Sequence, residues 1–118
     1  MYSERLIDHF RNPRFVGDLE EPAVTVEVMN PACGDVMRLS ALFDGEVVSE
    51  VRYRTRGCTA SIASGSALCE WMQGKARSDL ARIDADVVEQ AVGGLSPESR
   101  HAAMLCCDAV RSLLRVRR

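Results

Sequence analysis

The sequence predicts an α+β fold in which a three-stranded antiparallel sheet, a meander, packs against several helices. Segments with the two-residue periodicity of strands follow one another through short connections in the first half of the chain. The second half carries apolar residues at the spacing of amphipathic helices. A chain of 118 residues, 47% of them hydrophobic, is long enough for one modest core. We therefore expect a single domain over residues 1–118.

Alternation of apolar and polar residues defines the expected strands. Residues 23–28, AVTVEV, and 37–43, MRLSALF, alternate in this way, and so does EVVSEVRYRT at 46–55. The Asp44-Gly45 pair before the third segment is preferred chemistry for a two-residue hairpin turn. Short connections make neighbouring strands antiparallel, and helices must then cover one face of the sheet.

Helices are expected on both sides of the strand region. Their expected ranges are 2–11, 58–74, 77–94 (a helical turn and a short helix) and 96 to about 115. Asp84 or Asp86 is a candidate cap within the third range. The last helix begins with Ser96 as its cap and Pro97 at the first helical position, where proline is well suited.

Composition and charge exclude several classes of function. The net charge of −2 lacks the basic excess of nucleic-acid-binding proteins, so we expect no nucleic acid as a partner. The N-terminal segment has no long apolar run, which predicts neither a secretory signal nor a membrane span, and hence a cytoplasmic protein without a membrane partner. The 5 cysteines are an odd number, and in a reducing compartment they favour metal or sulfur chemistry over disulfides.

Two cysteines occupy junctions that the meander brings together. Cys33 lies in the turn between the first two strands, and Cys58 lies where the third strand passes into a helix. Each junction follows an odd-numbered strand, so both fall at the same end of the sheet. The start of a helix favours a thiolate at Cys58, and Asp35 adds a carboxylate that can ligate a metal. The spacing alone favours a metal or sulfur site only slightly over two structural thiols.

Motifs along most of the chain resemble the signatures of one known family. The segments YSERLIDHFRNPR, NPACGDVMRL, RGCTASIAS and CEWMQGK resemble those of the IscU family, iron-sulfur cluster assembly scaffold proteins related to the NifU N-terminal domain. The resemblance implies the IscU-like (SufE/NifU) α+β fold. It also implies a site of three cysteines, an aspartate and often a histidine. Cys33 and Asp35 match its CGD motif, Cys58 matches the cysteine that starts the long helix, and His101 matches the histidine.

The last motif departs from the family pattern. Where the family has His-Cys-Ser, the segment RHAAMLCCDAV has Ala102 after His101, so the chain resembles an atypical member without the third cysteine. The resemblance implies that this cysteine receives persulfide sulfur, which alanine cannot do. Cys106 lies on the same helical face, roughly 6 Å further along. It is either a further candidate ligand or a small thiol in the core. Residues 95–100, LSPESR, differ from the Leu-Pro-Pro-Val-Lys run, so docking of an Hsp70-type chaperone is not expected.

The resemblance implies an assembly scaffold and sulfur acceptor, a binding module and not an enzyme with turnover of its own. Its ligands would be Cys33, Asp35, Cys58 and His101, and they would hold an iron-sulfur cluster, 2Fe-2S foremost, or Zn²⁺. A cysteine desulfurase would be one partner, and recipient apo-proteins or carriers the others. Two alternatives stay open. One is a zinc-bound SufU-like sulfurtransferase, although that branch also relies on the cysteine that Ala102 replaces. The other is a degenerate paralogue with a regulatory or interaction role.

Overall fold

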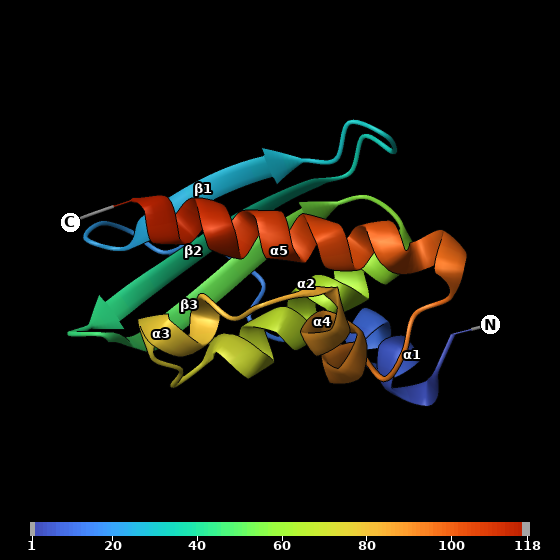
Figure 1. The fold of residues 1–118 in the computed structure, drawn as a ribbon, viewed down its shortest axis with the longest axis horizontal. Coiled ribbons are helices and arrows are strands. Elements are labelled where there is room, and N and C mark those ends of the chain that lie inside the picture. Colours follow the sequence, from blue (N-terminus) through green and yellow to red (C-terminus); the bar gives the residue numbers. More distant parts are fainter. Residues whose placement is uncertain (1, 117–118) are drawn as a thin grey trace.

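The computed structural model describes residues 2–116. Its elements are α1 (Glu4–Arg11), β1 (Val24–Met29), β2 (Val36–Asp44), β3 (Val47–Arg56), α2 (Thr59–Met72), α3 (Arg77–Leu80), α4 (Ala85–Val92), the 3₁₀ turn η1 (Pro97–Ser99) and α5 (Arg100–Arg115). The predicted α+β order is confirmed, with the strands together and most helices after them (Figure 1). Among the described residues, no helix has both the length and the apolar character that crossing a membrane requires.

The strands form a 3-stranded antiparallel meander in the order β1-β2-β3, as predicted. Val36, the first residue of β2, pairs with Met29 at the end of β1 and with Arg56 at the end of β3. The β1–β2 turn and the junction after β3 therefore lie at the same end of the sheet. This placement is the one that the sequence predicted for the two cysteine-bearing junctions.

The hairpin between β2 and β3 lies one residue later than predicted. Asp44 pairs with Val47, so the loop residues are Gly45 and Glu46 and not Asp44 and Gly45. Gly45 has a φ of 62°, a left-handed conformation that glycine adopts without steric cost. A positive φ at the first loop residue alone is typical of a type II′ turn, whose twist matches that of the flanking strands.

Helices α2 and α5 cover one face of the sheet, and α1 and α4 pack against α2 from outside (Figure 1). The strand residues on the covered face are buried, and they include Met37, Leu39, Ala41, Val51 and Tyr53. Residues of the opposite face, such as Glu27, Arg38 and Arg54, are exposed. The alternation from which the strands were predicted thus separates the core face from the exposed face.

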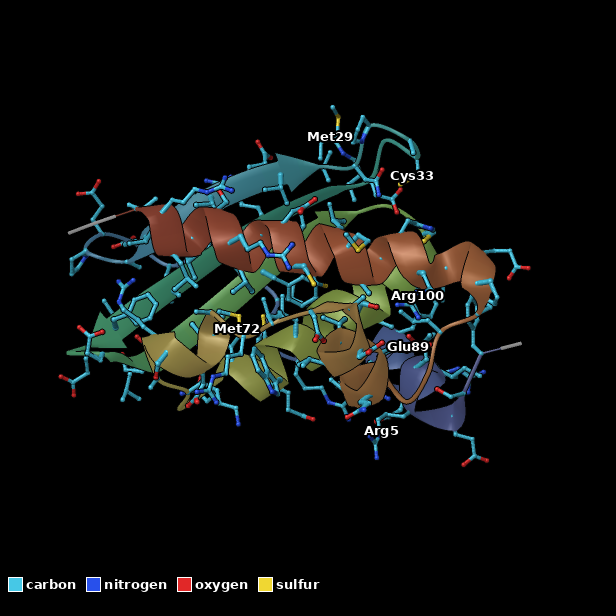
Figure 2. The ribbon with its side chains drawn as sticks, viewed as in Figure 1. Arg5, Met29, Cys33, Met72, Glu89 and Arg100 are labelled. Carbon is cyan, nitrogen blue, oxygen red and sulfur yellow. The ribbon has the colours of Figure 1, made fainter. Side chains whose placement is uncertain are left out.

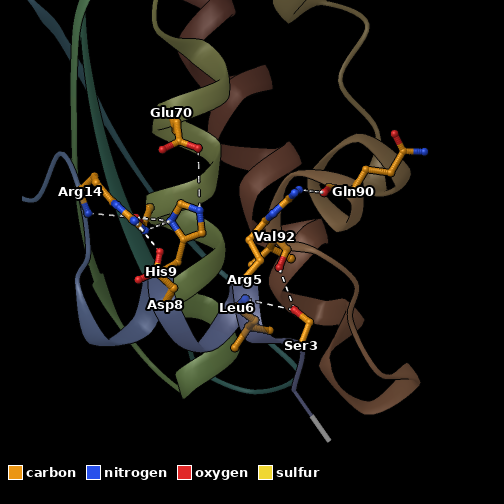
Figure 3. A network of polar contacts seen from close by, with 10 residues as sticks. Ser3, Arg5, Leu6, Asp8, His9, Arg14, Glu70, Gln90 and Val92 are labelled. Carbon is orange, nitrogen blue, oxygen red and sulfur yellow. Dashed lines mark hydrogen bonds and ion pairs between the residues drawn. The ribbon is translucent and has the colours of Figure 1, made fainter.

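Polar contacts attach α1 to α2 and α4 (Figure 3). The Ser3 hydroxyl caps α1 by accepting from the Leu6 N–H at 3.1 Å, and it donates to the carbonyl oxygen of Val92 in α4 at 3.2 Å. His9 is buried, and its Nδ1 lies 2.7 Å from Oγ of Ser66 in α2. The N-terminal helix is therefore a fixed part of the fold.

The segment after α1 runs along β3, which the sequence analysis did not predict. The N–H of Tyr53 donates to the carbonyl oxygen of Phe15 at 2.9 Å, and the N–H of Gly17 donates to the carbonyl oxygen of Tyr53 at 3.0 Å. Asp18 then forms an ion pair of 2.8 Å with Arg54 on the exposed face. The free edge of β3 is thereby partly covered.

The last helix begins later than predicted. Ser96 occupies the N-cap position of a 3₁₀ turn over Pro97–Ser99 without a capping hydrogen bond from its side chain, and α5 begins only at Arg100. The N–H of Ser99 donates to the carbonyl oxygen of Ser96 at 2.9 Å, an i to i+3 bond that is typical of a 3₁₀ turn. His101 consequently lies in the first turn of α5, where its side chain can face the end of the sheet.

Candidate metal centre

The predicted ligands come from separate elements that end at the same place. Cys33 lies in the β1–β2 turn, at the edge of the molecule beyond Met29 (Figure 2). Asp35 directly precedes β2, and Cys58 is the N-cap residue of α2. His101 extends from the first turn of α5. The sheet register and the packing of α2 and α5 on the sheet thus set their relative positions.

Donor atoms of Cys33, Asp35 and His101 lie within 4.8 Å of one another. Cys58 is not part of this mutual group, but its Sγ lies 3.4 Å from Nε2 of His101. Both cysteines are exposed, so a metal or a partner can reach them. Two sulfurs, one nitrogen and one oxygen are ligands that proteins use for tetrahedral Zn²⁺. Thiolates and, less often, imidazoles also bind the irons of iron-sulfur clusters.

A backbone carbonyl determines the tautomer of His101. Its Nδ1 lies 3.0 Å from the carbonyl oxygen of Glu98, and because a carbonyl can only accept, Nδ1 carries the proton. The lone pair of the neutral ring is then on Nε2, which lies 3.4 Å from Cys58 Sγ and 3.5 Å from Asp35 Oδ2. Metal-binding histidines commonly donate their other ring N–H to a carbonyl in this way. His101 therefore presents a free nitrogen to the other candidate ligands.

Arg100 anchors the start of α5 beside His101. Its Nη1 donates to Oε2 of Glu89 in α4 at 2.6 Å, and both side chains are labelled in Figure 2. A second, longer ion pair of 3.7 Å joins Arg100 to Asp86. These contacts connect the helix turn that carries His101 to α4.

Asp35 is 8% exposed and forms several hydrogen bonds. Ser61 Oγ donates to its Oδ2 at 2.5 Å, and the backbone of Cys58 also bonds to its carboxylate. Burial raises the pKa of Asp35, but the hydrogen bonds from Ser61 and Cys58 bring the pKa below its usual value. The carboxylate therefore remains ionised, as a metal ligand must be.

The other cysteines lie in the core and not at this site. Cys69, Cys106 and Cys107 are fully buried, and among the described residues the group that could hold a metal includes none of them. Burial raises the pKa of Cys106 well above its usual value, and the neighbouring Cys107 and Cys69 add to the effect. The structure thus places Cys106, the further candidate ligand, among core residues as a protonated thiol.

Sequence reasoning missed the groups that hold the ligands. Ser61 follows Cys58 by three residues, so the helical period alone places it beside Cys58 at the start of α2. Glu98 stands three residues before His101, but only its backbone takes part. The spacing of Ser61 from Cys58 was visible in the sequence. The contact of His101 with the Glu98 carbonyl was not, because it depends on the 3₁₀ turn.

The model of the NifU-like N-terminal domain matches residues 1–115 of this chain. The chain belongs to this family. Relatives include the iron-sulfur cluster assembly scaffold protein IscU 1 of Archaeoglobus fulgidus, with 37% identity over 94% of this chain and 72% of that protein. The scaffold protein IscU of Rickettsia prowazekii is 36% identical over 96% of this chain and 88% of its own length. A Drosophila melanogaster relative, with 37% identity over 97% of this chain and 76% of its own length, is named an iron-sulfur cluster assembly enzyme, IscU.

Two solved structures show the same fold. A protein from Fervidobacterium islandicum, described as an assembly scaffold for the SUF system, superposes with a TM-score of 0.79 at 24% identity and covers 96% of both chains. The N-terminal part of a NifU-like protein from Brucella abortus superposes with a TM-score of 0.65 at 25% identity, over 93% of this chain and 77% of that one. The family and the fold that the sequence motifs predicted are both confirmed.

Proposed function

We propose that this protein is an assembly scaffold for iron-sulfur clusters, and that Cys33, Asp35, Cys58 and His101 hold the nascent cluster as cargo. The observation that carries the proposal is the group of Cys33, Asp35 and His101, whose donor atoms lie within 4.8 Å of one another. The names of the NifU-like relatives as cluster assembly scaffolds support it.

The donor set suits a cargo that must arrive and leave. Cys33 and Cys58 lose their protons when they bind iron, and both are exposed to an incoming sulfur donor. His101 offers a free Nε2, and Asp35 an ionised oxygen, as ligands weaker than a thiolate. With two thiolates available, a 2Fe-2S cluster would have its remaining positions filled by these weaker ligands. Such a cluster is easier to release than one held by thiolates alone.

The sulfur would come from a cysteine desulfurase, and recipient apo-proteins or carriers would take the finished cluster. The chain itself binds and presents, while the bond-breaking step that supplies sulfur belongs to the desulfurase. We place this work in the cytoplasm, where a reducing environment keeps Cys33 and Cys58 as free thiols.

A zinc-bound sulfurtransferase is a second candidate. It is favoured by the same donors, because two sulfurs, one nitrogen and one oxygen are also acceptable ligands of a tetrahedral Zn²⁺. Metal content separates the two functions, since a scaffold accumulates iron with sulfide and a zinc-bound transferase does not.

The deciding experiment is metal analysis of protein that is produced beside a cysteine desulfurase and purified without oxygen. We expect iron and acid-labile sulfide in matching amounts in the wild type. Both should fall to background in the Cys33→Ser and Cys58→Ser variants, because each removes a thiolate ligand. Cys107→Ala is the matched control, because that thiol is buried in the core, and it should keep wild-type content.

Each other outcome has a distinct meaning. Zinc without sulfide in the wild type would support the sulfurtransferase. Wild-type iron in both Cys33→Ser and Cys58→Ser would place the cargo elsewhere and contradict the proposed ligands. A wild type that binds no metal under any of these conditions would favour a paralogue that kept the fold and lost the assembly function.

A further inference from the structure

We propose that Ser61 and Gly57 form a seat for the carboxylate of Asp35, and that this seat sets the affinity and geometry of the metal site. Asp35 directly precedes β2 and lies against the backbone at the start of α2. Gly57 lies just before that helix, and Ser61 lies in its first turn. The inference rests on the proposed function, because it assigns to Ser61 and Gly57 a positioning role at the same site.

Ser61 contacts two of the candidate ligands. It lies in the first turn of α2 and is fully buried, and its hydroxyl has its partners within the protein. The hydroxyl donates to Asp35 Oδ2 at 2.5 Å. The same oxygen lies 3.4 Å from Cys58 Sγ, where its lone pairs can accept from the thiol. One hydroxyl therefore relates the position of the carboxylate to that of the thiol.

Gly57 provides the space that Asp35 occupies. A Cβ at this residue would lie 2.5 Å from Cγ of Asp35, and 2.8 and 2.9 Å from its two oxygens. These separations are too short for real contacts, so any side chain at Gly57 must displace the carboxylate. Gly57 is not among the glycines with positive φ, so its role is to leave room and not to adopt an unusual backbone conformation.

The two seat residues restrict the carboxylate from different sides. Gly57 lets the group lie close to the backbone before α2, and the Ser61 hydroxyl then fixes its rotation about the last side-chain bond. In this orientation Oδ2 is 3.5 Å from Nε2 of His101. Loss of a group that orients a metal ligand typically lowers metal affinity by roughly 10- to 100-fold. The seat should therefore be measurable through the metal alone.

The test is anaerobic titration of the metal-free protein with Co²⁺, which reports affinity by competition with a chelator and geometry by its visible absorption bands. We expect Ser61→Ala to weaken binding by about 10-fold or more and to shift the bands. Ser64→Ala is the matched control, because this hydroxyl lies in the same helix, is buried and has no hydrogen-bond partner among the described residues. It should bind Co²⁺ like the wild type.

Gly57→Ala is the second variant, and it tests the seat without removing any hydrogen-bonding group. We expect it to fold, since alanine can adopt the backbone conformation of this residue, and to shift the cobalt bands because the carboxylate has moved. If Ser61→Ala did not fold, Gly57→Ala would carry the same test. Wild-type bands and affinity in both variants would overturn the proposal.

A double variant decides whether Ser61 acts through Asp35. In the Asp35→Ala background, Ser61→Ala should cause a much smaller further loss of Co²⁺ affinity, because the carboxylate that it positions is gone and only its contact with Cys58 Sγ remains. The same loss in both backgrounds would overturn the positioning role. A wild type that fails to bind Co²⁺ would contradict the proposed function as well, whereas wild-type binding with an unchanged Ser61→Ala variant would contradict the seat alone.

Discussion

Ala102 follows His101 in α5, at the position that the motif resemblance assigns to a third cysteine. Its methyl group is fully buried. The described thiols that a sulfur donor can reach are therefore Cys33 and Cys58, since Cys69, Cys106 and Cys107 are enclosed in the core. At the scale of single residues, alanine at this position leaves Cys33 and Cys58 as the thiols through which sulfur can enter the site.

Restoring the thiol tests this interpretation. Ala102→Cys should increase the fraction of protein that acquires a persulfide from a cysteine desulfurase, because the larger side chain does not fit the space of the buried methyl group and adds an acceptor next to the partly exposed His101. Mass spectrometry detects the added sulfur. Ala103→Cys is the control, since Ala103 is equally buried but its side chain points about 100° away around the helix. Equal gains in both variants would show that the motif is aligned in the wrong register, and no gain in either would show that the added thiol stays enclosed in the core.

The candidate ligands were predictable from sequence, and the groups that hold them were less so. Cys33, Asp35, Cys58 and His101 were found because each falls in a motif and the order of strands brings three of them to one end of the sheet. The hydrogen bond from Ser61 to Asp35 joins residues 26 positions apart. Such a pairing depends on how closely α2 approaches β2, which no local pattern specifies.

The contact between α2 and β3 depends on a glycine within the helix. A Cβ at Gly65 would lie 2.4 Å from Cε2 and 2.5 Å from Cδ2 of Tyr53. Tyr53 is 1% exposed, and its hydroxyl donates to the carbonyl oxygen of Ile62 at 2.8 Å. At the scale of the element, the absence of one side chain lets the aromatic ring lie against α2.

Gly65→Ala should destabilise the protein, although alanine is ordinarily favoured over glycine within a helix by about 1 kcal/mol. Overpacking against the Tyr53 ring should reverse that sign and lower the free energy of unfolding by about 1–3 kcal/mol. Urea unfolding measures the change. In a Tyr53→Leu background the same substitution should cost much less, and an undiminished cost there would mean that the ring is not the obstacle.

The ends of elements show which local signals are sufficient. Asp84 was expected as a cap, and its side chain does accept from the N–H of Val87 at 2.9 Å. Gly93 ends the same helix in a left-handed conformation. The start of α5 was predicted too early, because a proline and two serines suit both a 3₁₀ turn and an α-helix. Local chemistry indicated that a helix starts there but did not determine its type.

At the scale of the whole molecule, polar contacts attach the first helix to the rest of the fold. Nδ1 of buried His9 lies 2.7 Å from Ser66 Oγ and 3.1 Å from Nη1 of Arg14 (Figure 3). An arginine can only donate, so Nδ1 accepts and the ring is neutral, with its proton on Nε2, 4.0 Å from Glu70. Burial and then the charge of Arg14 lower the pKa of His9, while Glu70 and Asp8 oppose them and Arg5 adds to them.

This contact makes stability depend on pH. Because the folded state has the lower His9 pKa, the unfolded chain binds more protons below the ordinary value of about 6.5. The free energy of unfolding should therefore fall as the pH decreases from about 7.5 to 5.5, as chemical denaturation at each pH would measure. His9→Gln should flatten this dependence. An equally steep fall in His9→Gln would assign the effect to other groups.

At the same scale, the order of elements and the meander followed from periodicity, whereas one tertiary feature did not. The segment that contains Phe15 and Gly17 lacks strand periodicity, yet it pairs with Tyr53 along the edge of β3. Its hydrogen bonds use backbone groups, so its side chains carry no signal. Alternation predicts strands with one buried face, and it does not predict a short segment that only completes an edge.

The two ends of the sheet are far apart, and this separation allows the protein to be labelled at one end without disturbing the other. Asp35 precedes β2 and the hairpin follows it, so the 9 residues of β2 place these points about 30 Å apart along the strand. A dye or a surface tether attached through a non-natural residue in place of exposed Glu46 would leave the cysteines free. That spacing falls within the range of energy transfer, so cargo loading could be followed optically on one immobilised molecule at a time.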